Sequence, residues 1–157
     1  MLPPSKHDLI SKLFQAIESV LWNPQDGIWY DFDLKNQIQR RQFVATNVHP
    51  LWTESFPARQ FQIYAPKVLT YLEKTGVLDL PGGVPTTMKD SGQQWDKPNA
   101  WPPQQHVIME SLLKMGTELA KKRAYELAKK YIDGAYVAYL QKGTMYEKVS
   151  LAITVSQ

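Results

Sequence analysis

The chain has 157 residues, of which 43% are hydrophobic and 11% aromatic, and this composition fits one folded domain with its own core. The net charge is only +3 and the longest basic run, residues 121–123, is interpreted as a solvated helix face, so no nucleic-acid partner is expected. The absence of cysteine excludes disulfides and thiol chemistry. Neither an apolar signal segment nor a membrane-spanning segment is predicted, and the localisation stays unknown.

The N-terminal part is predicted to form a helix followed by a small hairpin. Ser5 is a good N-cap with Asp8 in the capping-box position, and apolar residues then recur at helical spacing until about Trp22. The aromatic segment 28–34 alternates in part and is expected to pair with residues 37–43.

Two further helices are expected before the middle of the chain. A short helix is predicted over 44–54, with Pro50 near its start. A clearer helical pattern covers 57–74, and Pro66 inside it predicts a break or kink. Gly76 then ends this helix in the left-handed position after its last turn.

The C-terminal part contains the strongest helical signals. Pro102-Pro103 is expected to open a helix, and Gly116-Thr117 to end it and cap the next one. That last helix extends from Glu118 to about Gln141, and Gly143 stops it. The resulting fold class is all-α, with about five helices and long loops at their ends, which suits a toroid of helical hairpins or a part of one.

The segment Pro81–Pro103 is a long loop with unusual chemistry. A loop of this length in a compact domain is usually either functional or disordered, and its two tryptophans argue against disorder. Aromatic faces stack on sugar rings while carboxylates and amides bind hydroxyls, and both kinds of group occur here: Gln93, Gln94, Trp95, Asp96, Asn99 and Trp101. The alternative is that the tryptophans only pack the loop to the helices and that the aspartate caps a turn.

Other catalytic arrangements are not supported. His7, His49 and His106 lack metal-ligand spacing, so neither a metal site nor a cofactor is predicted. No nucleophile elbow or phosphate-binding loop occurs. Carboxylates remain, and glycoside hydrolysis requires two of them across one bond; the candidates are Asp26, Asp31, Asp33, Asp90, Asp96 and Glu147.

Residues 94–103, QWDKPNAWPP, closely resemble a signature of the α,α-trehalases, a family of glycoside hydrolases. The family pattern reads QWDxP, one residue, a small residue, W, a small residue or proline, then P. Supporting resemblance occurs along nearly the whole chain, in LW at 21–22, GIWYDFDL at 27–34, NVHPLW at 47–52, PGGVPTT at 81–87, SGQ at 91–93 and YEK at 146–148.

This resemblance implies part of an (α/α)6 toroid whose loops close over trehalose. It also implies hydrolysis of the α,α-1,1 linkage to two glucose molecules with inversion, by an Asp acid and a Glu base. By the motif match, Glu147 has the position of the base that activates water. The residues expected to bind substrate are Gln94, Trp95, Asp96, Asn99 and Trp101.

The sequence also departs from the family pattern. The segment that carries the family's acid resembles SGWDFSSRW, and it has no counterpart here; after Lys148 the chain reads VSLAITVSQ instead of YD and a glycine-rich lid. We therefore expect residues 1–148 to be a partial trehalase catalytic domain without the general acid, and residues 149–157 a divergent C-terminal tail. Uncovered apolar helix faces would then favour association. The second hypothesis is a non-catalytic sugar-binding or interaction module derived from a trehalase.

Overall fold

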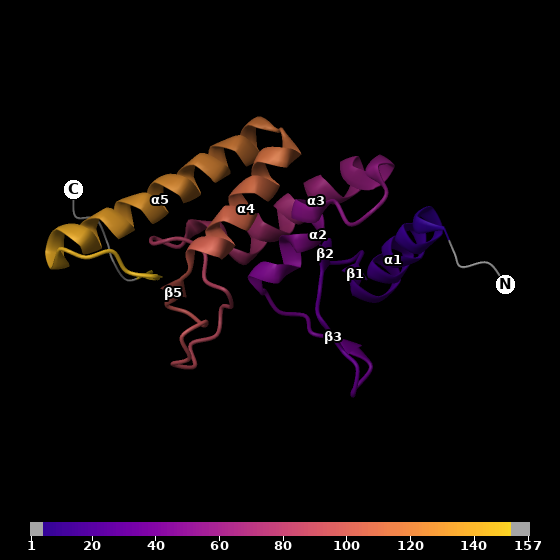
Figure 1. Ribbon diagram of the computed structural model, residues 1–157, viewed down its shortest axis with the longest axis horizontal. Helices are drawn as coiled ribbons and strands as arrows, with labels where there is room; N and C mark the ends of the chain where they lie inside the picture. Colours follow the sequence, from indigo (N-terminus) through magenta and orange to yellow (C-terminus); the bar gives the residue numbers. More distant parts are fainter. Residues whose placement is uncertain (1–4, 152–157) are drawn as a thin grey trace.

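The computed structural model describes residues 5–151, and five α-helices dominate this part of the chain (Figure 1). The helices are α1 (Lys6–Leu21), α2 (His49–Thr53), α3 (Phe61–Thr75), α4 (Pro102–Met115) and α5 (Glu118–Lys142). Three 3-10 turns accompany them: η1 (Ala45–Val48), η2 (Ala58–Gln60) and η3 (Val77–Asp79). The strands are two residues each: β1 (Trp22–Asn23), β2 (Ile28–Trp29), β3 (Phe32–Asp33), β4 (Ile38–Gln39), β5 (Asn99–Ala100) and β6 (Val149–Ser150).

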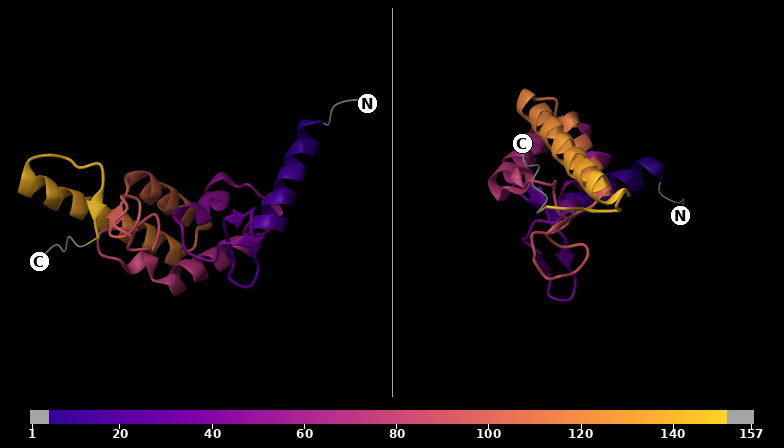
Figure 2. Two further views of the ribbon diagram at one scale, coloured as in Figure 1. Left: turned by 90° about the horizontal axis from the view of Figure 1, so that it is seen from below. Right: turned by 90° about the vertical axis from the view of Figure 1, so that its left-hand side faces the viewer.

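Helix α1 begins as the sequence predicts. The Ser5 side chain accepts a hydrogen bond from the Asp8 amide, and the Asp8 carboxylate accepts one from the Ser5 amide, so the capping box is complete. None of the residues of α1 is buried, and the helix projects from one end of the elongated molecule (Figure 2). Its apolar face packs against the core near its C-terminus, through Ile17 and Leu21.

The predicted hairpin forms only in part. Strand β3 pairs antiparallel with β4, with Phe32 opposite Gln39, but β2 does not continue this ladder. Instead β2 pairs back with β1, so that Trp29 lies opposite Trp22. The reason is the turn between them, because Gly27 takes a φ of 73° and its amide donates to the Asn23 carbonyl. The aromatic segment is therefore divided between two small hairpins.

The two middle helices follow the prediction except at Pro66. Pro50 lies in the first turn of α2, where its missing amide costs nothing. Helix α3, however, is one continuous helix through Pro66, so the expected break is wrong. Proline inside a helix costs about 3 kcal/mol, whereas each large side chain that becomes buried contributes about 1.5–3 kcal/mol. Pro66 is exposed, and burial of the other face outweighs its cost: Tyr64, Ala65, Val68, Leu69, Tyr71 and Leu72 are all buried.

An aromatic cluster joins α1, β2 and α3. The Trp29 ring lies 4.6 Å from that of Trp22, 5.0 Å from Tyr64 and 5.7 Å from Phe56, measured between centroids. The Tyr64 hydroxyl donates to Glu18 of α1 over 2.6 Å. Burial, followed by this hydrogen bond, raises the pKa of Tyr64 far above its usual value, so the phenol stays neutral. The cluster is the main contact that holds α1 against the fold.

Helices α4 and α5 form a hairpin that carries the C-terminal half (Figure 1). Gly116 ends α4 in the left-handed conformation, and the Thr117 side chain caps α5 by accepting from the Ala120 amide. Arg123 links α5 to α3 and η3. Its guanidinium donates to both carboxylate oxygens of Glu73, at 2.6 and 2.7 Å, and to the carboxylate of Asp79 at 3.0 Å. In residues 5–151 no helix combines the length and apolarity needed to cross a membrane.

Apolar surface is exposed at both ends of the molecule. Several large residues of α1 and α5 are each more than half exposed: Leu9, Ile10, Leu13, Tyr125, Ile132, Tyr136 and Leu140. On α5 the exposed stripe borders a shallow apolar groove of about 430 Å³ that includes Ile132 and Tyr136. Contiguous apolar surface of this kind favours association.

We expect the chain to self-associate through the exposed stripe of α5, and Ile132→Lys to weaken that association. Removing one buried isoleucine contact of about 1.5–3 kcal/mol predicts a dissociation constant at least about tenfold higher. Sedimentation velocity over a concentration series measures it. Gln141→Lys is the matched control, because it adds the same charge at an exposed polar position of the same helix. Equal effects of both substitutions would contradict a role for the stripe.

Candidate signature-loop site

The loop Pro81–Pro103 lies between η3 and α4 and is fixed by hydrogen bonds to the helical part. Its start contacts the N-terminal half, because the Ala45 amide donates to the Thr86 carbonyl over 2.8 Å. Figure 1 shows the loop extending from the end of α4 beside β5. Residues in it form turns and isolated bridges, so its shape depends on side-chain hydrogen bonds more than on regular structure.

Gln105, in the first turns of α4, is the main anchor of this loop. Its side chain is 1% exposed and bonds both polar groups of the Val84 backbone: the amide donates to Oε1 at 2.8 Å, and Nε2 donates to the carbonyl at 2.7 Å. Nε2 also donates to the Trp101 carbonyl at 3.0 Å. Gly83 permits this approach, since a Cβ there would lie 2.8 Å from Oε1. One buried amide therefore joins the beginning and the end of the loop.

Asp96 organises the middle of the loop. Its Oδ1 accepts from the Thr87 hydroxyl at 2.5 Å, and its Oδ2 accepts from the Ser91 hydroxyl. The Ser91 bond, then the Thr87 bond, lowers the pKa of this carboxyl, which therefore stays ionised. The backbone carbonyl of the same residue accepts from the Asn99 amide at 3.0 Å. In this arrangement the carboxylate is part of the loop's internal framework.

The two tryptophans of the loop stack on each other. The ring centroids of Trp95 and Trp101 lie 4.1 Å apart with an angle of 23° between the planes. Trp101 is 6% exposed and its Nε1 donates to the Gln94 carbonyl at 2.9 Å, whereas Trp95 is 44% exposed. The ammonium of Lys148 lies 5.7 Å from the centroid of the Trp101 ring, a cation–π contact. The stacked pair therefore has one exposed ring, that of Trp95, which lies on the buried and hydrogen-bonded ring of Trp101.

Strand β6 brings the segment that contains Glu147 to this loop. No regular pattern is predicted for residues 146–157, but Val149 pairs with Ala100 and Ser150 with Asn99 in an antiparallel bridge. Residues 152–157 of the predicted C-terminal tail lie outside the described residues. The Leu151 amide adds a bond to the Pro98 carbonyl at 2.7 Å. Glu147 itself is exposed, two residues before the strand and next to the lysine on the Trp101 ring.

The structure thus brings all six predicted site residues into one region. Trp95 and Trp101 stack, Asp96 and Asn99 shape the turn between them, and the Gln94 side chain is exposed while its carbonyl holds the indole. Their roles toward a substrate stay predictions. Sequence reasoning missed Gln105, although a glutamine just behind a double proline in a helix start is positioned to bond neighbouring backbone. It also missed the pairing of β6, because a two-residue strand has no periodicity to detect.

Two of the other candidate carboxylates, Asp26 and Asp33, have structural partners. Both oxygens of Asp26 bond Arg41 at 2.9 Å, and Asp33 accepts the amides of Lys35 and Asn36 in the β3–β4 turn. These bonds lower the pKa of Asp33, with the Asn36 side chain as the largest cause. In the described part of the chain no group of three or more His, Cys, Asp or Glu side chains could hold a metal ion.

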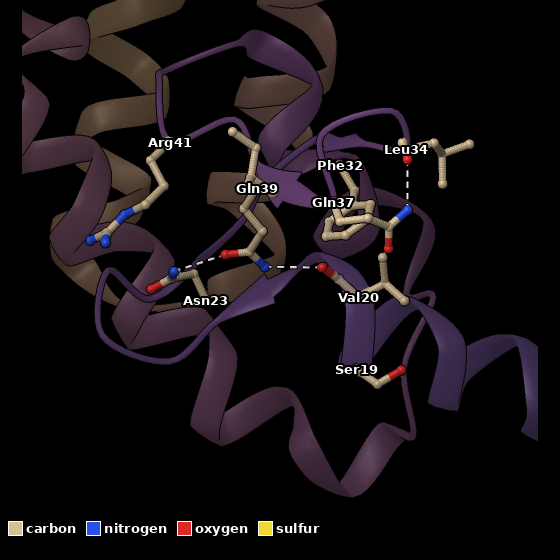
Figure 3. Close-up of a pocket in the computed structure, with 9 residues that line it drawn as sticks. Ser19, Val20, Asn23, Phe32, Leu34, Gln37, Gln39 and Arg41 are labelled. Carbon is tan, nitrogen blue, oxygen red and sulfur yellow. Dashed lines mark hydrogen bonds between the residues drawn. The ribbon is translucent and has the colours of Figure 1, made fainter.

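A hollow of about 740 Å³ lies between α1 and the β3–β4 hairpin (Figure 3). Its polar groups are largely bonded to one another. Gln39 accepts from Asn23 at 2.9 Å and donates to the carbonyl of Val20 at 3.0 Å, near the end of α1. The hollow shares no lining residue with the signature loop. Gln39 therefore satisfies the last carbonyls of a helix and does not belong to the site.

Similarity to known proteins extends over nearly the whole chain and includes this loop. The family model described as Trehalase matches residues 7–155. The chain belongs to the trehalase family. It is 43% identical over 141 residues to a trehalase of Pimpla hypochondriaca and 38% identical over 144 residues to a trehalase of Homo sapiens. These alignments cover 90% and 92% of this chain but 24% of each relative, so the chain spans about a quarter of their length.

A solved trehalase supports the fold. The neutral trehalase Nth1 from Saccharomyces cerevisiae superposes with a TM-score of 0.71 over 90% of this chain and 26% of that chain, at 21% sequence identity. This similarity confirms the predicted fold class, an all-α chain that is part of an (α/α)6 toroid. The trehalase signature therefore lies in the loop that leads into the N-terminus of a toroid helix, α4.

The β5–β6 pairing can be tested by cross-linking, because the chain has no cysteine of its own. Paired residues of antiparallel strands have Cα atoms about 4.5–5.5 Å apart, within the range that a disulfide spans. We expect Asn99→Cys/Ser150→Cys to oxidise rapidly to an intramolecular disulfide, detected by mass spectrometry. Asn99→Cys/Tyr146→Cys, outside the register, should stay mostly reduced. Equal oxidation of both pairs would mean that the register is not fixed.

We expect the signature loop to lose stability in acid, because the ionised Asp96 carboxylate accepts the hydrogen bonds that hold it. Its pKa is lower in the folded loop than in the unfolded chain, so its contribution to stability is complete above the unfolded value of about 3.9 and is lost as the pH falls through the folded value. Amide hydrogen exchange of residues 87–99, as a function of pH and corrected for intrinsic rates, measures this loss. Asp96→Asn should expose these amides already at neutral pH and remove the acid transition. An unchanged transition in that variant would assign it to another group.

Proposed function

We propose that this chain supplies part of the active site of an α,α-trehalase, which hydrolyses trehalose to two glucose molecules. Membership of the trehalase family over nearly the whole chain supports the substrate and the reaction class. The observation that carries the proposal is the convergence of the signature loop with the segment of Glu147, through the Lys148–Trp101 contact and the β5–β6 bridge. Two motifs about fifty residues apart in sequence thus share one surface.

In the proposed mechanism Glu147 is the general base of an inverting reaction. Its exposed carboxylate is free to approach a water molecule. Inversion requires a general acid on the other side of the bond, with the two carboxyl groups roughly 6.5–9.5 Å apart to admit that water. We infer that the acid is not supplied by these residues, since the nearby Asp96 has both oxygens bonded to hydroxyls and the acid-bearing motif has no counterpart in the sequence.

The signature loop is proposed to be one wall of the sugar pocket. The exposed Trp95 face suits the C–H face of a glucose ring, and Trp101 beneath it keeps that face in place. Gln94 and Asn99 provide amides for sugar hydroxyls. Asp96 is proposed to act mainly through the loop that it shapes. Trehalose is the expected small-molecule partner, and no cofactor is needed for this chemistry.

The alternative is a non-catalytic sugar-binding module derived from a trehalase. What favours it is that the aromatic surface is complete within this chain, whereas the proposed mechanism requires a second carboxylate. Binding and turnover are separate measurements, so the two functions can be distinguished on the same protein.

We expect the purified 157-residue chain to bind trehalose weakly and to release little or no glucose. Titration followed by tryptophan fluorescence measures binding, and Trp95→Ala should weaken it at least about fivefold, as loss of roughly 1 kcal/mol of buried apolar contact predicts. Sucrose, another non-reducing disaccharide, is the control ligand. Glucose release that Glu147→Gln abolishes would show that the chain contains both catalytic groups. A titration without saturation would remove the sugar-wall proposal.

A further inference from the structure

Two glycines flank strand β6, and a side chain at either position would crowd the strand. A Cβ on Gly82 would lie 2.8 Å from the Ser150 carbonyl oxygen and 3.0 Å from the Leu151 Cα. A Cβ on Gly134 would lie 3.0 Å from a methyl group of Val149. The first contact is with backbone, which cannot rotate away. Both glycines are buried.

Gly134 is the seventeenth residue of α5, in the interior of the helix, where glycine is among the poorest helix formers. Its conformation is helical, so no unusual backbone angle requires glycine there. What requires it is space, because Val149 is 3% exposed and packs directly onto this turn. The side chain of Val149 is therefore inserted between α5 and the signature loop.

The connection between α5 and β6 has little support of its own. Helix α5 ends at Gly143, and residues 143–147 are all exposed. Because these five residues are exposed, helix α5 does not by itself fix the position of the Glu147 side chain. In the described residues, this corner is held by the Lys148–Trp101 interaction, by the packing of Val149 and by the β5–β6 bridge.

We propose that β6, seated in the slot that Gly82 and Gly134 leave open, is the element that positions Glu147 against the signature loop. This inference rests on the proposed function for the role of Glu147, but its geometry concerns only the chain itself. Val149 is the positioning residue, because its buried side chain fixes how close the strand lies to α5. The backbone hydrogen bonds to residues 98–100 fix the register of the strand. The bond from the Leu151 amide to the Pro98 carbonyl closes the bridge directly at the turn formed by Asp96 and Asn99.

The test attaches bimane, a fluorophore that tryptophan quenches at short range, to Lys148→Cys in the cysteine-free chain. The side chain of Lys148 lies over Trp101, so the emission should be strongly quenched. Gly82→Ala and Gly134→Val, which obstruct the strand from two different elements, should each raise it to the level of a Trp95→Phe/Trp101→Phe reference. Tyr125→Val, an exposed position of α5, should leave the quenching unchanged.

A second pair of measurements separates positioning from general stability. Valine is a better helix former than glycine, so Gly134→Val should keep the helical circular dichroism while quenching is lost. Adding Val149→Ala to Gly134→Val removes the methyl that is obstructed and should restore most of the quenching. Quenching that persists in both glycine variants, or that is absent in the starting protein, would overturn the proposal. Trehalose is not present in these measurements, so their outcome is independent of sugar binding.

Discussion

The buried side-chain amide of Gln105 is the interaction on which the site depends. It satisfies the amide and the carbonyl of Val84 and the carbonyl of Trp101 at once, so it replaces the backbone partners that an irregular loop lacks. Buried backbone groups without partners are costly, and a long loop can lie against a helical core only if such groups are paired. By bonding both Val84 and Trp101, Gln105 holds the beginning and the end of the loop together.

The middle of the loop is held by a second set of hydrogen bonds, which its own side chains make. Asp96 gathers the hydroxyls of Thr87 and Ser91, and the turn that follows presents the stacked tryptophans. Strand β6 then adds the Glu147 corner to the same surface. The helices support a polar framework of hydrogen bonds, this framework supports the stacked tryptophans, and β6 adds the carboxylate that is proposed to be the base. This order leaves Trp95 and Glu147, the groups proposed to contact the ligand, exposed at the surface.

Elements with strong local signals were predictable. The capping box of α1, the double proline at the start of α4 and the Gly116-Thr117 junction all correspond to the structure, because each acts within one or two turns of chain. The break expected at Pro66 was wrong, since burial of the opposite face of α3 exceeds the local cost of proline. The aromatic hairpin was only partly right, because Gly27 turns β2 back onto β1.

The sequence by itself determined the family and pointed to the region of the candidate site, since residues 94–103 combine several aromatic, acidic and proline positions that rarely occur together by chance. It also determined the helical class through long-range periodicity. Only the tertiary structure decided how the parts meet: that Gln105 bonds Val84, that Lys148 covers Trp101, and that the tail pairs with the signature loop. These contacts join residues about twenty to fifty positions apart, and two-residue strands and single buried amides have no local pattern. Their free energy comes from the folded environment, which local sequence does not encode.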